Sequence, residues 1–341
     1  MFHLQKGIQP RFVHLAPQRA EKTFSSFLLR PNPTPTWKEP RVRKVCWEDG
    51  KSLNVLQVCG SRIICGFHDG QVRVYSYPDL QCEAALWSFS SECLVTCLQC
   101  TCSEIVVGYT DRNIRIWNIQ SGLLIQEFSV GASDNWSSGS GRHAVCMKWK
   151  APKLLVGTAD GRVSMWQFVN SSVLFLGERC FYNGPITSHE FDDDHVICMH
   201  STMASIHDSA GSQLRTIEIQ RSATARAVVF DRSSFIINGD DKKLRIWNAK
   251  TGNCLKELEG HEHGIVSVDA KNNVILSGDK TGQIIIWSLD AASSESRPIR
   301  TLRFHAPEVA KQSNGYYVGL GEKFIVLRQI ASTEISVIDY P

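Results

Sequence analysis

The stretch IVVGYTDRNIRIW, residues 105–117, is one of five copies of a single pattern in this chain of 341 residues. In each copy an apolar run reaches a small residue, a polar turn follows, and an alternating run ends in an aromatic side chain. The other copies are IICGFHDGQVRVY (63–75), LLVGTADGRVSMW (154–166), FIINGDDKKLRIW (235–247) and VILSGDKTGQIIIW (274–287). The alternation predicts two strands that each bury one face. The Asp-Gly step predicts the tight antiparallel turn between them.

The copies recur at steps of 40 to 49 residues, counted at the position six residues before the closing aromatic. Four copies place an aspartate there, and we assign weaker copies to Ser201, Thr281 and Gly321 or Glu322. The one long step contains the Gly/Ser-rich stretch VGASDNWSSGSG (130–141). A period near 40 residues with several strands per repeat is typical of four-stranded propeller blades. The aspartates are Asp69, Asp111, Asp160 and Asp241.

We therefore predict an all-β, seven-bladed β-propeller over residues 41–341. Its blades are expected at about 53–86, 93–129, 143–179, 185–219, 223–260, 265–304 and 308–341. A closed ring avoids an exposed edge strand. The last blade needs an outermost strand, for which VRKVCW (42–47) is favoured over EISVIDY (334–340). If both stretches pair, the count could rise to eight.

Residues 1–40 differ in composition from the rest. Half of the twelve prolines fall in this segment, and residues 1–47 hold nine Lys or Arg against two acids, whereas the whole chain has a net charge of +3. Such sequence has little to bury and few backbone donors. We expect a flexible basic arm with an N-terminus that is solvated; contact with acidic partners or RNA is the alternative.

The residues give no pattern for catalysis, a cofactor or a metal. Cys97, Cys100 and Cys102 form C-x2-C-x-C, but no second pair follows, and they fall on an expected inner strand. The acidic run 192–194 reads as a solvated turn. No nucleotide-binding glycine motif and no G-x-S-x-G is present, and no Cys/His pair is expected to meet. We expect a protein that is not an enzyme.

The stretch LKELEGHEHGIVSVDAKNNVILSGDKTGQIIIW (255–287) closely resembles a WD repeat, and the resemblance extends over about residues 43–341. It implies a hydrogen-bonded tetrad of His, Ser or Thr, the turn Asp and Trp. Here His261, Ser277 and Trp287 match, with Thr281 where Asp is usual, so no blade is expected to carry all four. The structural residues implied are Asp69, Asp111, Asp160, Asp241, His261, Ser277, Trp117, Trp166, Trp247 and Trp287.

Residues 52–86 and 95–122 are similar to the propellers of F-box/WD-repeat proteins, which are substrate receptors of cullin-type ubiquitin ligases. That resemblance implies a substrate-binding propeller that meets a cullin-ligase adaptor. Residues 1–40 show no F-box, which would be needed for the usual docking. The alternative is a general WD-repeat scaffold in a trafficking, signalling or RNA-metabolism complex.

Propellers present loops around a central channel, and one face should gather polar and aromatic side chains. Arg and Trp dominate interface energetics, and Arg pairs well with carboxylate or phosphate. We expect this face to bind a protein, as an acidic or phosphorylated peptide, with no nucleic acid or membrane involved. The chain shows no secretory signal or long apolar span, so we expect a monomeric intracellular propeller in the cytoplasm or nucleus. The expected binding residues are Trp136, Arg142, Arg221, Arg226, His68, His200 and Lys280.

Overall fold

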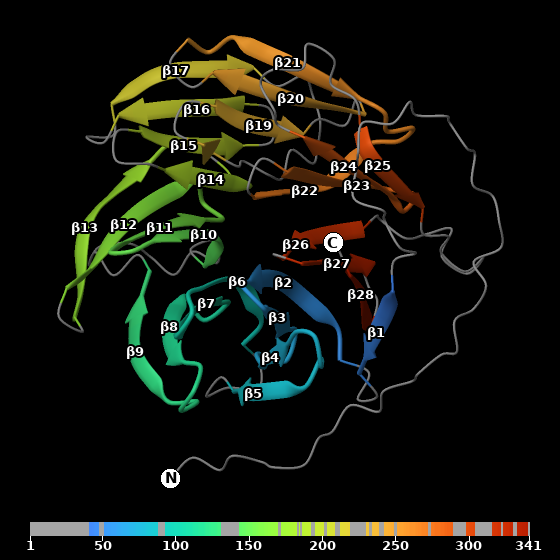
Figure 1. Ribbon diagram of the computed structural model, residues 1–341. Coiled ribbons are helices and arrows are strands. Elements are labelled where there is room, and N and C mark those ends of the chain that lie inside the picture. Colours follow the sequence, from blue (N-terminus) through green and yellow to red (C-terminus); the bar gives the residue numbers. More distant parts are fainter. Residues whose placement is uncertain are drawn as a thin grey trace.

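The computed structural model describes residues 41–47, 51–87, 93–130, 143–169, 172–182, 184, 186–191, 195–200, 203–208, 212–218, 230–231, 234–238, 242–248, 251–271, 274–288, 298–303, 316–321, 323–329 and 333–339. The strands in these residues form seven antiparallel sheets of four strands each. Figure 1 shows the sheets arranged in a ring, with the first strand of each sheet toward the middle. The arm predicted at 1–40 lies outside the described residues.

Three sheets follow one another in the first half of the chain, each running from its innermost to its outermost strand. The first holds β2 (Leu53–Cys59), β3 (Arg62–Phe67), β4 (Val72–Ser76) and β5 (Cys82–Leu86). The second holds β6 (Val95–Cys100), β7 (Glu104–Tyr109), β8 (Asn113–Asn118) and β9 (Leu124–Ser129). The third holds β10 (Ala144–Lys150), β11 (Lys153–Thr158), β12 (Arg162–Val169) and β13 (Ser172–Cys180).

Three further sheets have the same order. The fourth holds β14 (Ser188–Phe191), β15 (His195–His200), β16 (Met203–Asp208) and β17 (Gln213–Glu218). The fifth holds β18 (Phe230–Asp231), β19 (Ser234–Asn238), β20 (Lys243–Asn248) and β21 (Cys254–Glu259). The sixth holds β22 (Ile265–Lys271), β23 (Val274–Asp279), β24 (Gln283–Ser288) and β25 (Pro298–Arg303).

The prediction of a seven-bladed propeller was wrong, because the described residues form six complete blades. Six sheets consist of strands of at least four residues, whereas the innermost strand of the fifth sheet, β18, has only two. It pairs with β19 through two residue pairs alone, Phe230 with Phe235 and Asp231 with Ser234. The described residues thus hold six complete blades and one fragmentary blade. A hydrophobic pattern shows where a strand can form, but not how far its pairing extends.

The last sheet joins the two ends of the described chain. It holds β26 (Tyr316–Leu320), β27 (Phe324–Gln329) and β28 (Glu334–Asp339), with β1 (Val42–Cys46) as the outermost strand. The two candidate closing strands therefore both pair, but within one sheet, so the idea that this would add an eighth blade is wrong. The assignment of Gly321 to the turn between second and third strands is wrong too, because that residue follows the first strand, β26.

The aromatic that ends each repeated phrase packs between neighbouring sheets. In the first sheet Tyr75 is buried with Leu53, Phe67 and Trp47, and the same cluster includes Phe324 and Val337 of the last sheet. The Trp47 indole donates a hydrogen bond to the Tyr75 hydroxyl at 2.7 Å and meets the Phe67 ring edge-on. Large buried aromatic groups of this kind supply much of a core's apolar burial.

Close packing explains why the repeated phrase has a glycine near the end of its first strand. A Cβ added to Gly66 would lie 2.6 Å from a Val95 methyl, and one added to Gly108 would lie 2.7 Å from the Cys97 sulfur. Val95 is on β6, the innermost strand of the next sheet from Gly66. Cys97 is on β6 in the same sheet as Gly108 and pairs with it, and the Ala144 Cβ of the next sheet would lie 3.1 Å from the added atom. Glycine therefore allows the second strand to approach side chains that a larger residue would displace.

Closure of the ring should depend on the buried face of β1. Val45 is buried in the cluster with Tyr75, whereas Val42 on the same strand is 47% exposed. We expect Val45→Ala to lower the free energy of unfolding by about 2 kcal/mol, since it removes buried methyls and leaves a cavity. Val42→Ala, the matched control, should cost less than about 0.5 kcal/mol. Urea denaturation of both variants measures this, and equal losses would contradict it.

Candidate functional site

The turns between second and third strands lie together at one end of the sheets, which we call the turn face. Four of these turns make the same backbone hydrogen bond to the segment that leads into the innermost strand. The donors are the amides of His68, Thr110, Ala159 and Lys280, and the acceptors are the carbonyls of Ser52, Leu94, His143 and Gly264. The common register means that the turns and the entry segments form one surface in each of these blades.

The residue after the acidic position has a left-handed conformation in each described turn of this type. The φ angles are +79° at Gly70, +86° at Gly161 and +91° at Gly282, and Arg112 adopts +70°. This geometry is the one a three-residue hairpin loop requires. At Gly161 a Cβ would also lie 1.9 Å from the Tyr182 carbonyl oxygen, so no side chain fits there.

The predicted turn aspartates hold their turns through backbone and side-chain donors. Asp69 accepts from the Gln71 amide at 3.1 Å and pairs with Lys51 at 2.6 Å. Asp111 accepts from the Asn113 amide at 2.9 Å and from Arg115 at 2.7 Å.

In the third blade, Asp160 accepts the Thr158 hydroxyl and pairs with Arg162. Asp241 lies outside the described residues.

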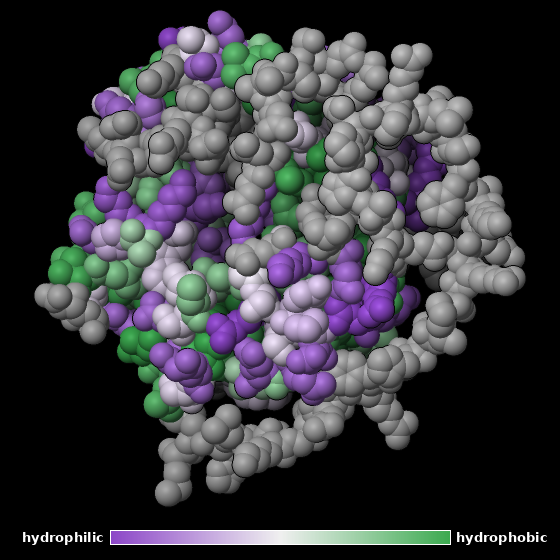
Figure 2. Space-filling model, in the orientation of Figure 1, coloured by the Kyte–Doolittle hydropathy of each residue, from purple (hydrophilic) through white to green (hydrophobic). Residues whose placement is uncertain are grey.

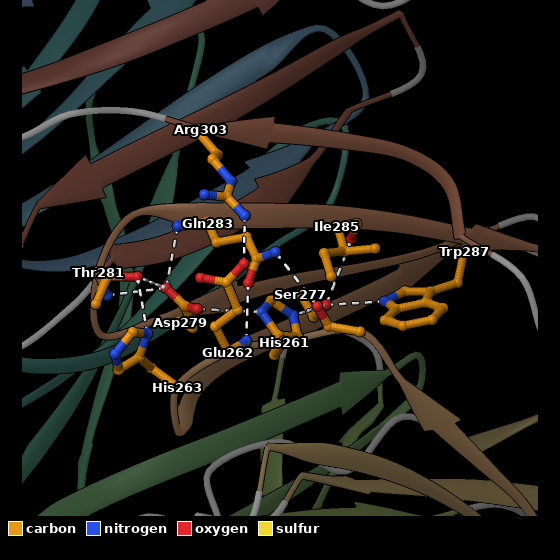
Figure 3. Close-up of polar contacts among 11 residues, drawn as sticks. His261, Glu262, His263, Ser277, Asp279, Thr281, Gln283, Ile285, Trp287 and Arg303 are labelled. Carbon is orange, nitrogen blue, oxygen red and sulfur yellow. Dashed lines mark hydrogen bonds and ion pairs between the residues drawn. The ribbon is translucent and has the colours of Figure 1, made fainter. Parts of the chain in front are cut away.

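The sixth sheet contains a connected set of buried polar side chains (Figure 3). The Trp287 indole donates to the Ser277 hydroxyl oxygen at 2.9 Å, and that oxygen lies 2.6 Å from His261 Nε2. His261 Nδ1 lies 3.4 Å from an Asp279 carboxylate oxygen. A chain of donation from Trp through Ser to His, and from His Nδ1 to Asp, satisfies every member.

The expectation that no blade carries a complete tetrad is therefore wrong. His261, Ser277 and Trp287 meet as the resemblance implied, and Asp279 supplies the acid two residues before the position that we assigned to it. Asp279 also accepts from the amides of Thr281 and Gln283, at 2.8 and 3.0 Å, and from the Thr281 hydroxyl at 2.8 Å. Its carboxylate thus both caps the turn and completes the tetrad.

The third blade carries the mirror arrangement of the same two residue types. There Thr158 ends the second strand and Asp160 is in the turn, whereas the sixth blade has Asp279 at the strand end and Thr281 in the turn. In both, the threonine hydroxyl donates to the carboxylate. The matching strand-end positions are Phe67 and Tyr109 in the first two blades. The sequence therefore did contain a signal for Asp279: compared with the third blade, the threonine and the aspartate have exchanged their two positions around the turn.

Hydrogen bonds keep Asp279 ionised. Burial raises the pKa of this carboxyl, but bonds from His261, Thr281 and Gln283 outweigh burial and leave the pKa below its ordinary value. A carboxylate with several donors is stabilised in its charged form.

The other predicted tryptophans lie on the third strands of their blades. Trp117 and Trp166 are buried, and Trp247 is half-buried. The Trp166 indole donates to the Ser164 hydroxyl at 2.9 Å. In the fourth blade His207 replaces the aromatic, and its Nε2 lies 2.7 Å from the Ser205 hydroxyl. A polar ring can thus fill this position when a serine on the same strand partners it.

Three of the predicted binding residues are described. His68 and Lys280 lie in turns of the first and sixth blades, and His200 ends the second strand of the fourth blade, where its ring stacks on Tyr182 at 5.0 Å. They lie on separate blades rather than in one contact cluster. Trp136, Arg142, Arg221 and Arg226 lie outside the described residues.

Sequence reasoning missed an exposed aromatic on the turn face. Trp87 follows the outermost strand β5 and is 43% exposed, and the Lys51 ammonium lies 4.6 Å from the centre of its ring. Lys51 in turn pairs with Asp69.

The expectation that no Cys/His pair would meet is also wrong. Cys146 Sγ lies 2.9 Å from His189 Nδ1, and His189 Nε2 lies 3.0 Å from the Leu155 carbonyl oxygen. Burial raises the pKa of the Cys146 thiol, and burial lowers the pKa of His189 to about 4. Both shifts favour the neutral forms, so the pair lacks the thiolate that nucleophilic chemistry requires.

Within the described ranges, no group of three or more His, Cys, Asp or Glu side chains is arranged to hold a metal ion. The same ranges contain no helix with the length and apolar character needed to cross a membrane.

Solved structures share this architecture. The WD40 β-propeller domain of Doa1 superposes with a TM-score of 0.62 at 14% identity, covering 85% of this chain and 97% of that domain. The computationally designed Ika8 protein superposes with a TM-score of 0.63 at 20% identity, covering 85% of this chain and 83% of that one. The sequence profile of the WD domain, G-beta repeat (WD40), matches residues 252–288.

Curated relatives share shorter stretches. Mitochondrial division protein 1 of Aspergillus clavatus is 26% identical over 99 residues, or 28% of this chain. The DENN domain and WD repeat-containing protein SCD1 of Arabidopsis thaliana is 23% identical over 184 residues, or 52% of this chain. The sterol regulatory element-binding protein cleavage-activating protein of Xenopus laevis is 25% identical over 214 residues, or 62% of this chain. The match spans 15% of the length of each relative.

The ring of sheets is the β-propeller fold, and the matched profile shows a WD repeat at residues 252–288, in the blade that carries the tetrad.

The tetrad should matter for stability. Ser277→Ala leaves the buried Trp287 indole and His261 ring without their shared partner, so we expect a loss of about 2 kcal/mol in the free energy of unfolding. Ser172→Ala changes an exposed serine at the start of β13 and should cost less than about 0.5 kcal/mol. Denaturant titration compares them; a Ser277→Ala variant as stable as its control would refute the tetrad's contribution.

The acid dependence of stability should also change at Asp279. A carboxyl whose folded pKa lies below its unfolded value contributes stability that is present above the unfolded pKa, about 4, and is lost as pH falls through the folded pKa. Between pH 6 and pH 3, Asp279→Asn should therefore lose less stability than the unaltered protein. Asp79→Asn, at an exposed position, should keep the full loss. Urea midpoints at both pH values provide the measurement.

Proposed function

We propose that this propeller is a protein-interaction scaffold and that it engages its partners through the turn face. The observation that carries the proposal is the common register of the turns, which presents side chains from separate blades on one rigid surface. His68, His200 and Lys280 occupy that surface on three different blades, and the exposed ring of Trp87 lies on the first blade. Loops held by a rigid scaffold are where binding residues concentrate.

The partner that fits this surface is an acidic or phosphorylated peptide. Lys280 is exposed, and imidazole groups at His68 and His200 add hydrogen-bond donors. Trp87 offers an aromatic anchor of the kind that contributes strongly to interfaces. Figure 2 shows hydrophilic residues spread over the described part of one face, with smaller hydrophobic patches among them.

A general scaffold within a multiprotein complex is better supported than a ubiquitin-ligase receptor. The relatives reported above carry names of mitochondrial division, DENN-domain and sterol-regulatory proteins. We therefore favour a complex in membrane trafficking or organelle dynamics. The receptor interpretation depends on the likeness of residues 52–86 and 95–122 alone. Affinity purification of the full chain separates the two, since recovery of a cullin with its adaptor would favour the receptor.

Reversing a charge on the turn face tests whether that face binds the partner. We expect Lys280→Glu to weaken capture of the main copurifying partner by about tenfold or more, because it places a negative charge opposite an acidic ligand. Lys323→Glu makes the same change between β26 and β27, at the opposite end of the sheets, and should leave capture unchanged. Quantitative mass spectrometry of purified complexes gives the ratio. If both variants retain the partner equally, the turn face is not the binding surface.

A further inference from the structure

The outermost strand of the third blade, β13, has an unusual composition for the edge of a sheet. Its residues 172–177 read SVLFLG, so its first charged side chain is Glu178, at the seventh position. The other described outermost strands each carry a charged side chain within their first four residues; they are β1, β5, β9, β17, β21 and β25. Charged residues on an edge strand oppose pairing with another chain. Over residues 172–177, β13 lacks this protection.

The apolar side chains of β13 are open to solvent. Leu174, Phe175 and Leu176 are 49%, 52% and 48% exposed, and Val169 at the end of β12 is exposed as well. Each of the other described outermost strands has at most one large apolar residue that is exposed to this degree. Figure 2 shows hydrophobic residues at the margin of the molecule where Figure 1 places β13. A contiguous apolar patch of this kind indicates an interaction surface.

The strand is also held in an extended form. β13 pairs with β12 from Arg162 opposite Cys180 to Val169 opposite Ser172. The Phe175 ring packs on Trp166, with the ring centres 4.9 Å apart. β13 is the last strand in the order of its sheet, so its outer edge has no partner strand among the described residues.

We propose that the outer edge of β13 binds an extended segment of a partner protein, which adds a fifth strand to the third blade. The added strand runs antiparallel to β13, as the neighbouring strands of this blade do to one another. Its backbone pairs with the edge, its apolar side chains cover Leu174 and Leu176, and an acidic side chain at its N-terminal end lies opposite Arg179. In strand addition, main-chain hydrogen bonds supply affinity and side-chain contacts supply specificity.

The charges at the end of β13 specify the acidic residue. Glu178 is already paired, because the Arg162 guanidinium lies 2.9 Å from its carboxylate. Arg179 is exposed and forms no ion pair with a described residue. It lies at the C-terminal end of β13, which the N-terminal end of an antiparallel strand reaches. Opposite charges that face each other across two strands stabilise the pairing.

A second copy of this chain fits the edge less well. If two β13 strands pair with Leu176 opposite Leu176, each Arg179 lies opposite a Val173 and finds no acid. If Glu178 lies opposite Arg179 instead, Leu176 is paired with a residue beyond the end of the strand, and the apolar side chains no longer match. A segment of a different protein can satisfy the apolar residues and Arg179 together.

A labelled synthetic peptide tests the edge on the full chain. In this probe one aspartate precedes valines that alternate with threonines, and fluorescence anisotropy measures its binding. Leu174→Lys should weaken binding about tenfold or more, because a lysine on an edge strand opposes pairing. Leu214→Lys on β17 is the matched control, since that side chain is 52% exposed on another outermost strand, and it should leave binding unchanged. Equal affinity of the two variants, or no binding to the unaltered protein, would overturn the proposal.

Backbone pairing and charge are tested separately. Only one of the two alternating sets of peptide amides faces β13, so N-methylation of that set should abolish binding and N-methylation of the other should not. Arg179→Glu should weaken binding of the aspartate peptide and strengthen binding of a peptide with lysine in its place. If both N-methylated peptides bind as the parent does, or if Arg179→Glu does not discriminate between aspartate and lysine, the assigned pairing is wrong.

Two controls separate this surface from the turn face and from self-association. Lys280→Glu should leave peptide binding unchanged, because Lys280 lies in a turn of the sixth blade, so the two proposals can fail independently. Sedimentation velocity of the unaltered chain should show a monomer. A dimer that Leu174→Lys dissociates would mean that a second copy covers the edge, and the proposed partner strand would then be wrong.

Discussion

Ring closure is the constraint on which the rest of this structure depends. β1 pairs with β28 over five residues, from Val42 opposite Ile338 to Cys46 opposite Glu334. Arg43 adds an ion pair to Asp339, and Arg328 donates to the carbonyls of Leu53 and Asn54 on the first blade. The β1 contacts complete the last blade, and the Arg328 hydrogen bonds join that blade to the first, so every complete blade has a neighbour on each side. An open ring would expose two apolar sheet faces and an edge.

Close packing between blades also explains why the polar residues near the turns can differ from one repeat to the next. Glycine in the second strand lets the next blade's innermost strand approach, and the large aromatic on the third strand fills the remaining space. With the apolar packing fixed, the polar positions around the turn can differ. One blade completes a four-membered hydrogen-bonded set, whereas another uses Trp with a serine two residues away, and a third substitutes His207.

The β-propeller architecture could be predicted from the sequence because the alternation of apolar and polar residues in the repeated phrase shows which face of each strand is buried. Asp279 was missed because we looked for the acid at one fixed distance from Trp287, whereas an acid at either end of the three-residue turn can accept the hydrogen bond. The last blade was misread because Gly319 and its neighbours resemble a second strand, although they form the first. The meeting of Cys146 with His189 depends on a contact between blades that no local pattern encodes.

The closing strand has a consequence for synthesis of the protein. Arg43 and its partner Asp339 are 296 positions apart, so β1 leaves the ribosome long before β28 exists. At about 5 to 20 residues per second, that delay is on the order of 15 to 60 s. Through that interval the early blades can collapse locally, but the ring stays unfinished and β1 has no sheet to join. Long-range pairing of this kind slows folding and exposes the nascent chain to aggregation, so the seam that stabilises the finished ring is also the last part of it to form.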